Sequence, residues 1–321
     1  MKLLVTGGLG FIGSNFINYW LSNHPDDHIV NVDKVTYATN FDNIDKPDSE
    51  NYRFAKADIN DRKVMEDLIS TSDAVINFAA ESHVDNSIFS PEEFLRSNYM
   101  GVFNILELVR KYDKRFHQVS TDEVYGSLPL DSRDRFNENS CYNPRNPYSS
   151  TKAAADHLIR AYVNTYGIKA TISTCSNNFG PNQHPEKLIP KTILNALSGL
   201  KIPIYGNGKQ VRDWIYVEDH CRALDLIIHN GRKGETYLVS SENEINNLEV
   251  VNMILDVLGE PNGLIEHVTD RPGHDKRYAL SPEKIRKELG WSPRNNFEDA
   301  LRKTIKHYRE NVYKYSSMKH A

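Results

Sequence analysis

The sequence predicts an α/β fold, with a doubly wound parallel sheet followed by a smaller C-terminal α/β domain. Short apolar runs rich in β-branched residues alternate with amphipathic stretches in the first half of the chain, as is typical of parallel strands joined by helices. A glycine-rich turn follows the first of these runs, and glycine and proline become frequent after Phe179. This higher frequency of turn-forming residues indicates that a second domain begins near residue 176.

The strands of the sheet are predicted from β-branched runs bounded by turn residues. Each run is five to seven residues long, as expected for strands that are buried on both faces. The predicted strands are Lys2–Thr6, His28–Val32, Tyr52–Lys56, Ala74–Ala79, Arg115–Ser120 and Lys169–Cys175.

Two long helices are predicted from capping residues and periodicity. Ser90 precedes Pro91 and an acidic third residue, which favours a helix from Ser90 through about Lys111. Apolar residues recur at helical spacing after Pro147, which predicts a second helix as far as Thr165. Further helices are predicted in the C-terminal part, at Asn247–Leu258, at Pro282–Leu289 after a Ser281 cap, and from Phe297 onward.

The bulk composition excludes several classes of protein. With 39% hydrophobic and 26% charged residues, the 321-residue chain is an ordinary globular protein. A formal net charge of -4 gives no general reason to bind nucleic acid or an anionic membrane surface. The first apolar run ends at Gly7, too early for a signal peptide, and no stretch is long enough to span a membrane.

The cysteines predict neither disulfides nor a metal site. Cys141, Cys175 and Cys221 lie far apart and show no spacing typical of metal ligands. We therefore expect no metal, and a location in the reducing cytoplasm.

A dinucleotide site is predicted at the first strand-to-helix turn. Gly7, Gly10 and Gly13 follow the first strand at GxxGxxG spacing, where side chains would block the turn and the approach of a pyrophosphate. The helix that follows offers free N–H groups to the phosphates. The pattern predicts a Rossmann domain at residues 1–175 with a returning segment at about 213–242, and a mainly substrate-binding domain at 176–321. A glycine turn without a ligand is the alternative.

Three further positions fit the adenosine end of the cofactor. Asp33 follows the last glycine by about twenty residues, where a carboxylate accepts hydrogen bonds from ribose hydroxyls and favours NAD over NADP. Lys34 beside it weakens that preference. Asp58 and Ile59 fit an adenine contact or a simple helix cap, and the small residues at Phe78–Ala80 fit either cofactor passage or packing.

An oxidation centre is predicted at Tyr148 and Lys152. Their spacing places a phenol and an ammonium on the same face of a helix. A phenol is a poor base at neutral pH until a nearby cation stabilises the phenolate. Ser120 or Thr121, at the end of the fifth strand, can bind the same alcohol. A core tyrosine with a solvated lysine is the alternative.

Two adjacent carboxylates, Asp122 and Glu123, follow the fifth strand directly. Neighbours in a strand point to opposite faces, so both can serve one substrate only if the chain is already turning there. After oxidation of a sugar at C4, one base at C5 and one acid at the C6 hydroxyl eliminate water. A solvated pair of acids at a strand end is the alternative.

The combined pattern resembles the extended short-chain dehydrogenase/reductase superfamily, and within it the dTDP-glucose 4,6-dehydratase family. The resemblance covers nearly the whole chain. It is carried by the segments Phe78–Asp85, Thr121–Gly126, Cys175–Asn178, Pro185–Pro190, Arg212–Trp214 and Asp270–Asp275. The chain departs from the family pattern at Asn86, where arginine is usual, and at Val239–Ser241.

The resemblance implies an NAD-dependent lyase with Tyr148 as the C4 base, Asp122 as the acid, Glu123 as the C5 base, Lys152 beside them and Thr121 holding the sugar. It implies cofactor contacts at Gly7, Gly10, Phe11, Ile12, Gly13, Asp33, Lys34, Thr36, Asp58, Ile59, Ala79, Ala80, Ser97, Tyr148, Lys152 and Asn178. It implies substrate contacts at Ser82, Thr121, Asn177, Lys187, Leu188, Pro203, Tyr205, Arg212, Asn247, Asp270, Arg271 and His274.

The resemblance further implies a cytoplasmic enzyme of deoxysugar and rhamnose biosynthesis that uses dTDP-glucose. It also implies a homodimer formed through the helices at Pro91–Lys111 and Tyr148–Tyr166. Two rivals remain: a sugar-nucleotide epimerase or decarboxylase on the same scaffold, and a catalytically silent NAD-binding protein. The residues do not distinguish thymine from uracil in the substrate, because one methyl group changes a pocket too little.

Overall fold

The computed structural model describes residues 1–270 and 272–316 and confirms the predicted α/β fold. Within these residues, seven parallel strands form the main sheet in the order β10-β6-β5-β4-β1-β2-β3, the order of a doubly wound dinucleotide-binding fold with one added strand. The strands are β1 (Lys2–Thr6), β2 (His28–Asp33), β3 (Tyr52–Lys56), β4 (Ala74–Asn77), β5 (Arg115–Thr121), β6 (Lys169–Cys175) and β10 (Thr236–Val239).

The predicted strand ends differ from the structure by one or two residues. β2 and β5 each extend one residue further, to Asp33 and Thr121, whereas β4 ends at Asn77 instead of Ala79. β4 ends early because the chain after Asn77 passes the turn at Gly7: a Cβ on Gly7 would lie only 2.6 Å from the Ala79 nitrogen. The segment after β4 is therefore shaped by the glycine turn.

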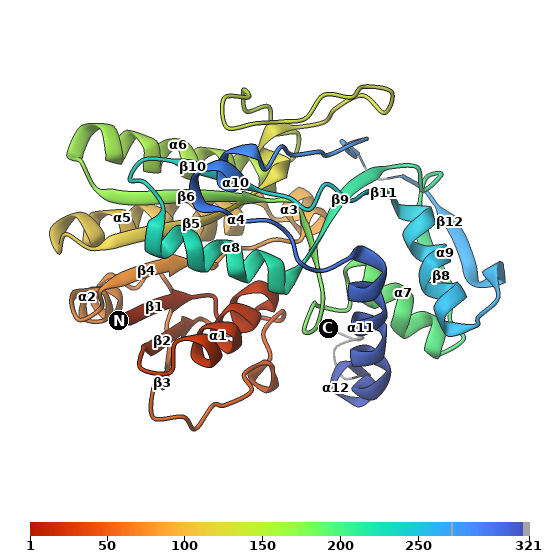
Figure 1. Cartoon of the computed structure of the whole chain (residues 1–321), viewed down its shortest axis with the longest axis horizontal. Helices are drawn as coiled ribbons and strands as arrows, with labels where there is room; N and C mark the ends of the chain where they lie inside the picture. Colours follow the sequence, from red (N-terminus) through yellow and green to blue (C-terminus); the bar gives the residue numbers. More distant parts are fainter. Residues whose placement is uncertain (271, 317–321) are drawn as a thin grey trace.

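Helices cover both faces of the main sheet (Figure 1). α2 (Arg62–Ser70), α5 (Gly101–Lys111) and α6 (Pro147–Tyr166) pack on one face. α1 (Phe11–Asn23) and α8 (Val217–Asn230) pack on the other. Strands with apolar side chains on both faces need such two-sided cover.

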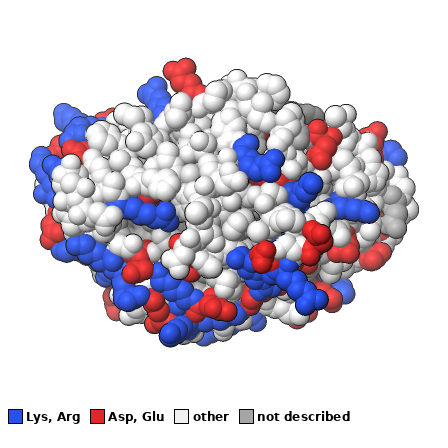
Figure 2. All heavy atoms as spheres, turned by 90° about the horizontal axis from the view of Figure 1, so that it is seen from above, with Lys and Arg blue, Asp and Glu red and all other residues white. Residues whose placement is uncertain are grey.

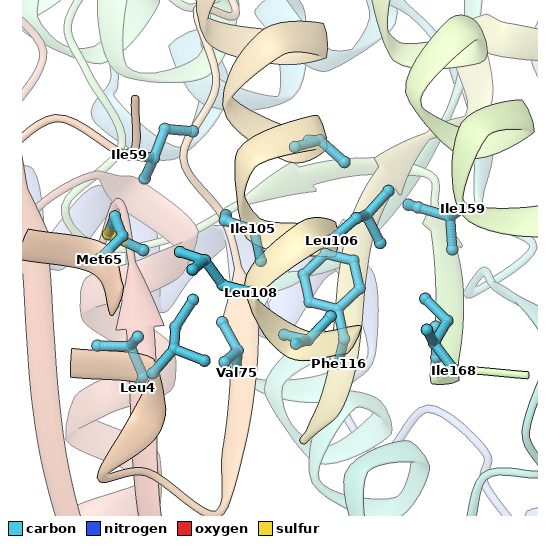
Figure 3. Close-up of a cluster of buried hydrophobic side chains, with 14 of the residues drawn as sticks. Leu4, Ile59, Met65, Val75, Ile105, Leu106, Leu108, Phe116, Ile159 and Ile168 are labelled. Carbon is cyan, nitrogen blue, oxygen red and sulfur yellow. The ribbon is translucent and has the colours of Figure 1, made fainter. Parts of the chain in front are cut away.

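The larger buried cluster lies between the sheet and the helices α2, α5 and α6. Figure 3 shows side chains from the strands, such as Val75 and Phe116, meeting Ile105 and Leu108 from α5. Ile159, on α6, extends the cluster to the next helix. Burial of a side chain of this size contributes roughly 1.5–3 kcal/mol, so this layer holds the strand ends in a fixed frame.

The helix predicted at Ser90–Lys111 is divided into three pieces. α3 (Val84–Phe89) precedes it; α4 (Pro91–Phe94) is followed by a π-helical stretch at Leu95–Met100 and then by α5. Ser90 occupies the N-cap position, but the prediction of its cap is wrong because its side chain makes no capping hydrogen bond. The π-helical stretch carries Asn98, whose amide bonds the Glu81 backbone and the Thr151 hydroxyl. Such stretches are frequent at functional sites.

The smaller lobe lies at the right of Figure 1. Its strands, as far as the structure describes the chain, form a three-stranded sheet of β11 (Glu244–Asn246), β9 (Val211–Tyr216) and β7 (Asn177–Phe179), and a pair of β12 (Ile265–Val268) and β8 (Ile202–Tyr205). Its helices are α7 (Leu188–Leu197), α9 (Asn247–Leu258), α11 (Phe297–Glu310) and α12 (Val312–Ser316). Short 3-10 turns lie at Phe41–Asn43, Asp122–Tyr125 and Asn262–Leu264.

The C-terminal helices agree with the sequence except at one cap. α9 has the predicted ends, whereas α10 (Glu283–Leu289) is preceded by Pro282 and has no side-chain cap, so the predicted Ser281 cap is wrong. After β9, the chain returns to the large sheet through α8 and β10. The division into domains at residue 175 stays a prediction.

Candidate active site

A cavity of about 330 Å³ lies at the carboxyl ends of the parallel strands, where open α/β sheets bind their ligands. Most residues predicted from sequence to contact cofactor or substrate line it. These are Gly7, Gly10, Phe11, Ile12, Gly13, Asp33, Lys34, Thr36, Asp58, Ile59, Ala79, Ala80, Ser82, Ser97, Thr121, Asp122, Glu123, Tyr148, Lys152, Asn177, Asn178 and Lys187.

The glycine turn has the shape that a dinucleotide requires. Gly7 has a φ of 68°, which L-residues rarely adopt, and its carbonyl accepts the Gly10 N–H at 3.2 Å. Gly10 is the N-cap of α1 and has no side chain above the first turn of that helix. Backbone N–H groups and the positive end of the helix dipole therefore face an anion bound at this end.

Asp33, at the end of β2, is held by the glycine turn. One carboxylate oxygen accepts the Leu9 N–H at 3.1 Å and the other the Val35 N–H at 2.8 Å. Burial raises the pKa of Asp33, and these two hydrogen bonds oppose that rise. Each oxygen keeps a further lone pair for a ribose hydroxyl.

Lys34 does not offer a free charge to a ribose phosphate. Its ammonium lies 2.9 Å from a Glu81 oxygen and donates to the Ser97 hydroxyl at 3.2 Å. Because Glu81 neutralises the charge of Lys34, this lysine attracts the ribose phosphate of NADP less than a free lysine would, which leaves the preference for NAD in place. After β3, one Asp58 oxygen accepts the backbone and side-chain N–H groups of Asn60. Asp58 is not the helix cap that was its alternative role, because Asp61 caps α2.

Tyr148 and Lys152 lie in the first two turns of α6. The helix begins at a capping box in which Asn146 accepts the Ser149 N–H at 2.8 Å, and Pro147 follows directly. Tyr148 is 8% exposed and Lys152 4%. Burial raises the pKa of Tyr148 well above its usual value and lowers that of Lys152. A phenolate therefore forms here only with a positive charge beside it.

The chain turns directly after β5, as the adjacent carboxylates require. Thr121 caps a 3-10 turn at Asp122–Tyr125 by accepting the Glu123 N–H. Successive side chains in such a turn point about 120° apart rather than to opposite faces. Both Asp122 and Glu123 consequently line the cavity that Tyr148 lines.

The two carboxylates have different surroundings. Asp122 is 2% exposed, and one of its oxygens has no hydrogen-bond partner among the described residues. Burial and then the charge of Glu123 raise the pKa of Asp122 well above its usual value, against a smaller opposing effect from Arg212. Glu123 accepts a hydrogen bond from the Asn146 amide at 3.3 Å. The pair can therefore divide into a proton donor and a carboxylate base.

A second group of predicted substrate residues lies outside the lining of this cavity: Leu188, Pro203, Tyr205, Arg212, Asn247, Asp270 and His274. Arg212 is buried and donates to the Val211 and Asp275 carbonyls at 2.8 and 3.0 Å. His274 lies 2.6 Å from Asp270, and the Tyr205 hydroxyl donates to Asp85 at 3.2 Å. Arg271 lies outside the described residues.

Sequence reasoning missed two polar residues next to the oxidation centre. Asn146 contacts Glu123, and its position before Pro147 could have identified it as a helix cap. Asp156 lies one turn after Lys152, and its charge acts on that lysine. Of the two hydroxyls proposed for the alcohol, Ser120 donates to Asp156 instead, whereas Thr121 makes a hydrogen bond to Tyr148.

One group of potential metal ligands exists in the described part of the chain: His24, Asp225 and His229, with ligand atoms within 4.8 Å of one another. Both histidines lie within hydrogen-bond distance of Asp225, at 3.1 and 2.8 Å. The group lies between α1 and α8 and is not part of the cavity lining. The absence of a metal stays a prediction.

The chain belongs to the GDP-mannose 4,6 dehydratase family, whose model matches residues 4–304. Similar curated proteins within this family are dTDP-glucose 4,6-dehydratases. A dTDP-glucose 4,6-dehydratase of Mycobacterium tuberculosis (strain CDC 1551 / Oshkosh) is 50% identical over 323 residues, covering 100% of this chain and 97% of the relative. The dTDP-glucose 4,6-dehydratase 1 of Escherichia coli (strain K12) is 47% identical, covering 97% and 94%.

Solved structures confirm the fold. The crystal structure of DesIV, a dTDP-glucose 4,6-dehydratase from Streptomyces venezuelae with NAD and TYD bound, superposes with a TM-score of 0.96 at 41% identity, covering 99% of this chain and 100% of that one. A UDP-glucose 4-epimerase from Thermus thermophilus in complex with NAD superposes with a TM-score of 0.89 at 27% identity, covering 97% and 100%. The scaffold is thus shared by dehydratases and epimerases.

Proposed function

We propose that the chain converts dTDP-glucose to dTDP-4-keto-6-deoxy-glucose by an NAD-dependent 4,6-dehydration. The observation that carries the proposal is the Asp122–Glu123 turn, which brings two carboxylates of different character into the cavity of Tyr148. The dTDP-glucose 4,6-dehydratases that are about half identical over the full length support the substrate. An epimerase needs no such acid and base after the fifth strand.

Oxidation at C4 uses Tyr148 as the base, with Thr121 binding the same hydroxyl. Bound NAD supplies the acceptor for the C4 hydride and the source of the hydride returned to C6. The glycine turn and Asp33 offer the pyrophosphate and ribose contacts that this cofactor needs. Burial of Tyr148 excludes water from the proton transfer, and Lys152 supplies the positive charge that a buried phenolate requires.

Elimination across C5–C6 divides between the two carboxylates. The C4 ketone acidifies the C5 proton, which Glu123 removes while Asn146 holds its carboxylate. Burial raises the pKa of Asp122 and so favours its protonated form, and we assign it the proton that goes to the leaving C6 hydroxyl. Water leaves with the proton from Asp122. As the hydride reaches C6, the proton held by Glu123 returns to C5, and the proton that Tyr148 took from the C4 hydroxyl replaces the one lost by Asp122 through exchange with solvent.

The fate of the C4 hydrogen tests this reaction. With dTDP-glucose deuterated at C4, we expect the deuterium at C6 of a 4-keto-6-deoxy product, read by NMR and mass spectrometry. UDP-glucose is the matched control substrate, and its turnover relative to dTDP-glucose shows whether the enzyme prefers thymine or uracil in the nucleotide. Deuterium recovered at C4, with an epimerised sugar, would instead establish the epimerase and reject dehydration.

A homodimer and a cytoplasmic location belong to the same proposal. Apolar side chains are exposed before and within the helix predicted to form the interface: Phe89 at 84%, Leu95 at 52% and Met100 at 48%. Figure 2, which looks from above onto the side where α6 lies in Figure 1, shows a face whose middle is poor in charged side chains. No described helix is long and apolar enough to cross a membrane. Unpaired Cys141, Cys175 and Cys221 support a reducing compartment.

Native mass measurement tests the dimer. We expect twice the chain mass for the wild type and a shift to monomer in Leu95→Asp, because a carboxylate buried at an apolar interface is unfavourable. A wild type that remains monomeric at micromolar concentration rejects this part of the proposal.

A further inference from the structure

A buried carboxylate, Asp156, lies behind the oxidation centre and has no part in the steps above. It is on α6, one turn after Lys152, so both side chains lie on the same face of the helix. Asp156 is 0% exposed. A carboxylate in such a place is costly unless a charge or hydrogen bonds compensate for its lost hydration.

Hydrogen bonds hold only one oxygen of this carboxylate. The Ser120 hydroxyl donates to Oδ2 at 2.6 Å and the Tyr142 hydroxyl donates to it at 3.0 Å. Arg160 in turn donates to the Tyr142 hydroxyl at 2.8 Å and stacks its guanidinium over that ring. The other oxygen, Oδ1, has no hydrogen-bond partner in the part of the chain that the structure describes. The side chain is thus fixed in place with one oxygen left to interact by charge.

Lys152 needs a nearby negative charge in order to stay protonated. Its ammonium donates to the Val119 carbonyl at 2.8 Å and is otherwise surrounded by protein. Burial lowers the pKa of Lys152, and the charge of Asp156 is the largest effect in the opposite direction, followed by Cys175. Burial raises the pKa of Asp156, and the charge of Lys152, followed by the Ser120 hydrogen bond, opposes that rise and favours the carboxylate.

We propose that Asp156 is a positioning residue for the oxidation step: its carboxylate, held by Ser120 and Tyr142, keeps Lys152 charged beside Tyr148. Asp156 acts through Lys152 and touches neither substrate nor cofactor. The inference rests on the proposed function, because the charge of Lys152 matters only if Tyr148 is the base. Asp156 is then the third functional group on the face of α6 that carries Tyr148 and Lys152.

The charges around Tyr148 define what the removal of Asp156 would change. Glu123 and Asp122 face Tyr148 from the end of β5, and Cys175 faces it from β6. Asp156 itself is faced by Lys152 and Arg160 on its own helix, by Ser120 on β5, and by Tyr142. Replacement of Asp156 by the isosteric amide therefore removes the negative charge that acts on Lys152. The carboxylates that face Tyr148 directly stay in place.

The test follows the ionisation of Tyr148 in Asp156→Asn with NAD bound. Without the carboxylate, Lys152 loses its proton more easily, so Tyr148 ionises at higher pH. We expect its ultraviolet tyrosinate signal, taken as the difference from Tyr148→Phe, to move up by about one pH unit. The pH at which removal of the C4 hydride begins should move equally, about tenfold slower at neutral pH. Asp156→Glu should restore most of the loss.

Tyr142→Phe is the matched control, because it removes one hydrogen bond to Asp156 and keeps the charge. Its Tyr148 signal should stay near that of the wild type. An unshifted signal in Asp156→Asn, or an equal shift in Tyr142→Phe, overturns the inference. If Asp156→Asn does not fold, the smaller Asp156→Ser, which also removes the charge, must shift the signal in the same direction, and no shift overturns the inference. Failure of wild-type turnover would reject the proposed function, whereas the ultraviolet titration still tests Asp156.

Discussion

Two parts of the cavity, here called its cofactor half and its reaction half, are built by different physical means. The cofactor half, residues 7–13 and 33–36, is made of backbone shape: a positive φ at Gly7, a helix N-cap without a side chain at Gly10, and a carboxylate fixed by backbone N–H groups. The reaction half, residues 120–123 and 148–156, is made of ionisable groups removed from water. The comparison teaches that steric changes should impair the first half and charge changes the second.

The largest effect is expected in the reaction half, from Glu123→Gln. The amide keeps the size of the side chain and cannot remove the C5 proton, so turnover of dTDP-glucose should fall by roughly 10²–10⁴-fold, the usual contribution of a general base. Oxidation at C4 should survive. Exchange of the C5 proton with deuterated water, followed by NMR, measures the lost step directly.

Glu66→Gln is the matched control for that variant. Glu66 lies on α2, pairs with Lys111 and is not part of the cavity lining, so the same carboxyl-to-amide change should leave turnover within about twofold of the wild type. Turnover by Glu123→Gln at the wild-type rate would remove this residue from the mechanism and return the chain to the epimerase alternative.

A smaller effect is expected in the cofactor half, from Gly13→Ala. The added Cβ would lie 2.5 Å from the Gly7 oxygen and 2.8 Å from the Gly8 Cα, both backbone atoms that cannot move aside. Overpacking of this kind costs about 1–3 kcal/mol, so the free energy of unfolding should fall by that amount in denaturant titrations. Binding of NAD should weaken as the turn shifts.

Gly10→Ala is the counterpart that separates shape from ligand contact. A Cβ there would meet only the Gly7 oxygen, at 3.4 Å, so stability should change by less than about 0.5 kcal/mol. NAD affinity should still fall, because the new methyl group covers the helix start. Equal loss of stability in the two variants would contradict the steric account of this turn.

The last effect concerns pH and two buried histidines outside the lining of the cavity. Burial lowers the pKa values of His117, on β5, and His220, on α8, to about 3. Both stay neutral in the fold while the unfolded chain takes up protons below pH 6.5. Their contribution is therefore complete above pH 6.5 and is lost as the pH falls toward 3, by up to about 1.4 kcal/mol per pH unit for each.

Buried Asp213 works against this loss. Burial raises its pKa to about 6, so it takes up a proton in the fold before it does in the unfolded chain and stabilises the fold as the pH falls from 6 toward 3.8. Burial also raises the pKa values of Asp33 and Asp122, which act in the same direction as Asp213. The contribution of His117 is therefore measured as a difference: in denaturant titrations, the stability of His117→Gln relative to the wild type should rise as the pH falls from 6 to 4.5. An unchanged slope would mean that His117 is charged in the fold.

How much of this could be predicted depended on how locally each feature is encoded. β1, β3 and β6 have the ends expected from their apolar runs, and the GxxGxxG turn with Asp33 is legible within about thirty residues. The Ser90 and Ser281 caps failed because a capping hydrogen bond depends on the backbone angle that tertiary packing imposes. The π-helical stretch was not predicted for the same reason, because it depends on tertiary contacts: Asn98 forms hydrogen bonds to two segments that are distant in sequence.

The sequence by itself determined the fold class, the glycine turn and the residues proposed to carry the chemistry, because strand periodicity, glycine at a tight turn and a tyrosine four residues before a lysine are local properties of the chain. Tertiary structure alone decided which of Ser120 and Thr121 faces Tyr148, that Lys34 is paired with Glu81, and that Asp122 is buried, which raises its pKa. These are matters of burial and of charges brought together from separate elements, and no spacing along the chain encodes the distance between them.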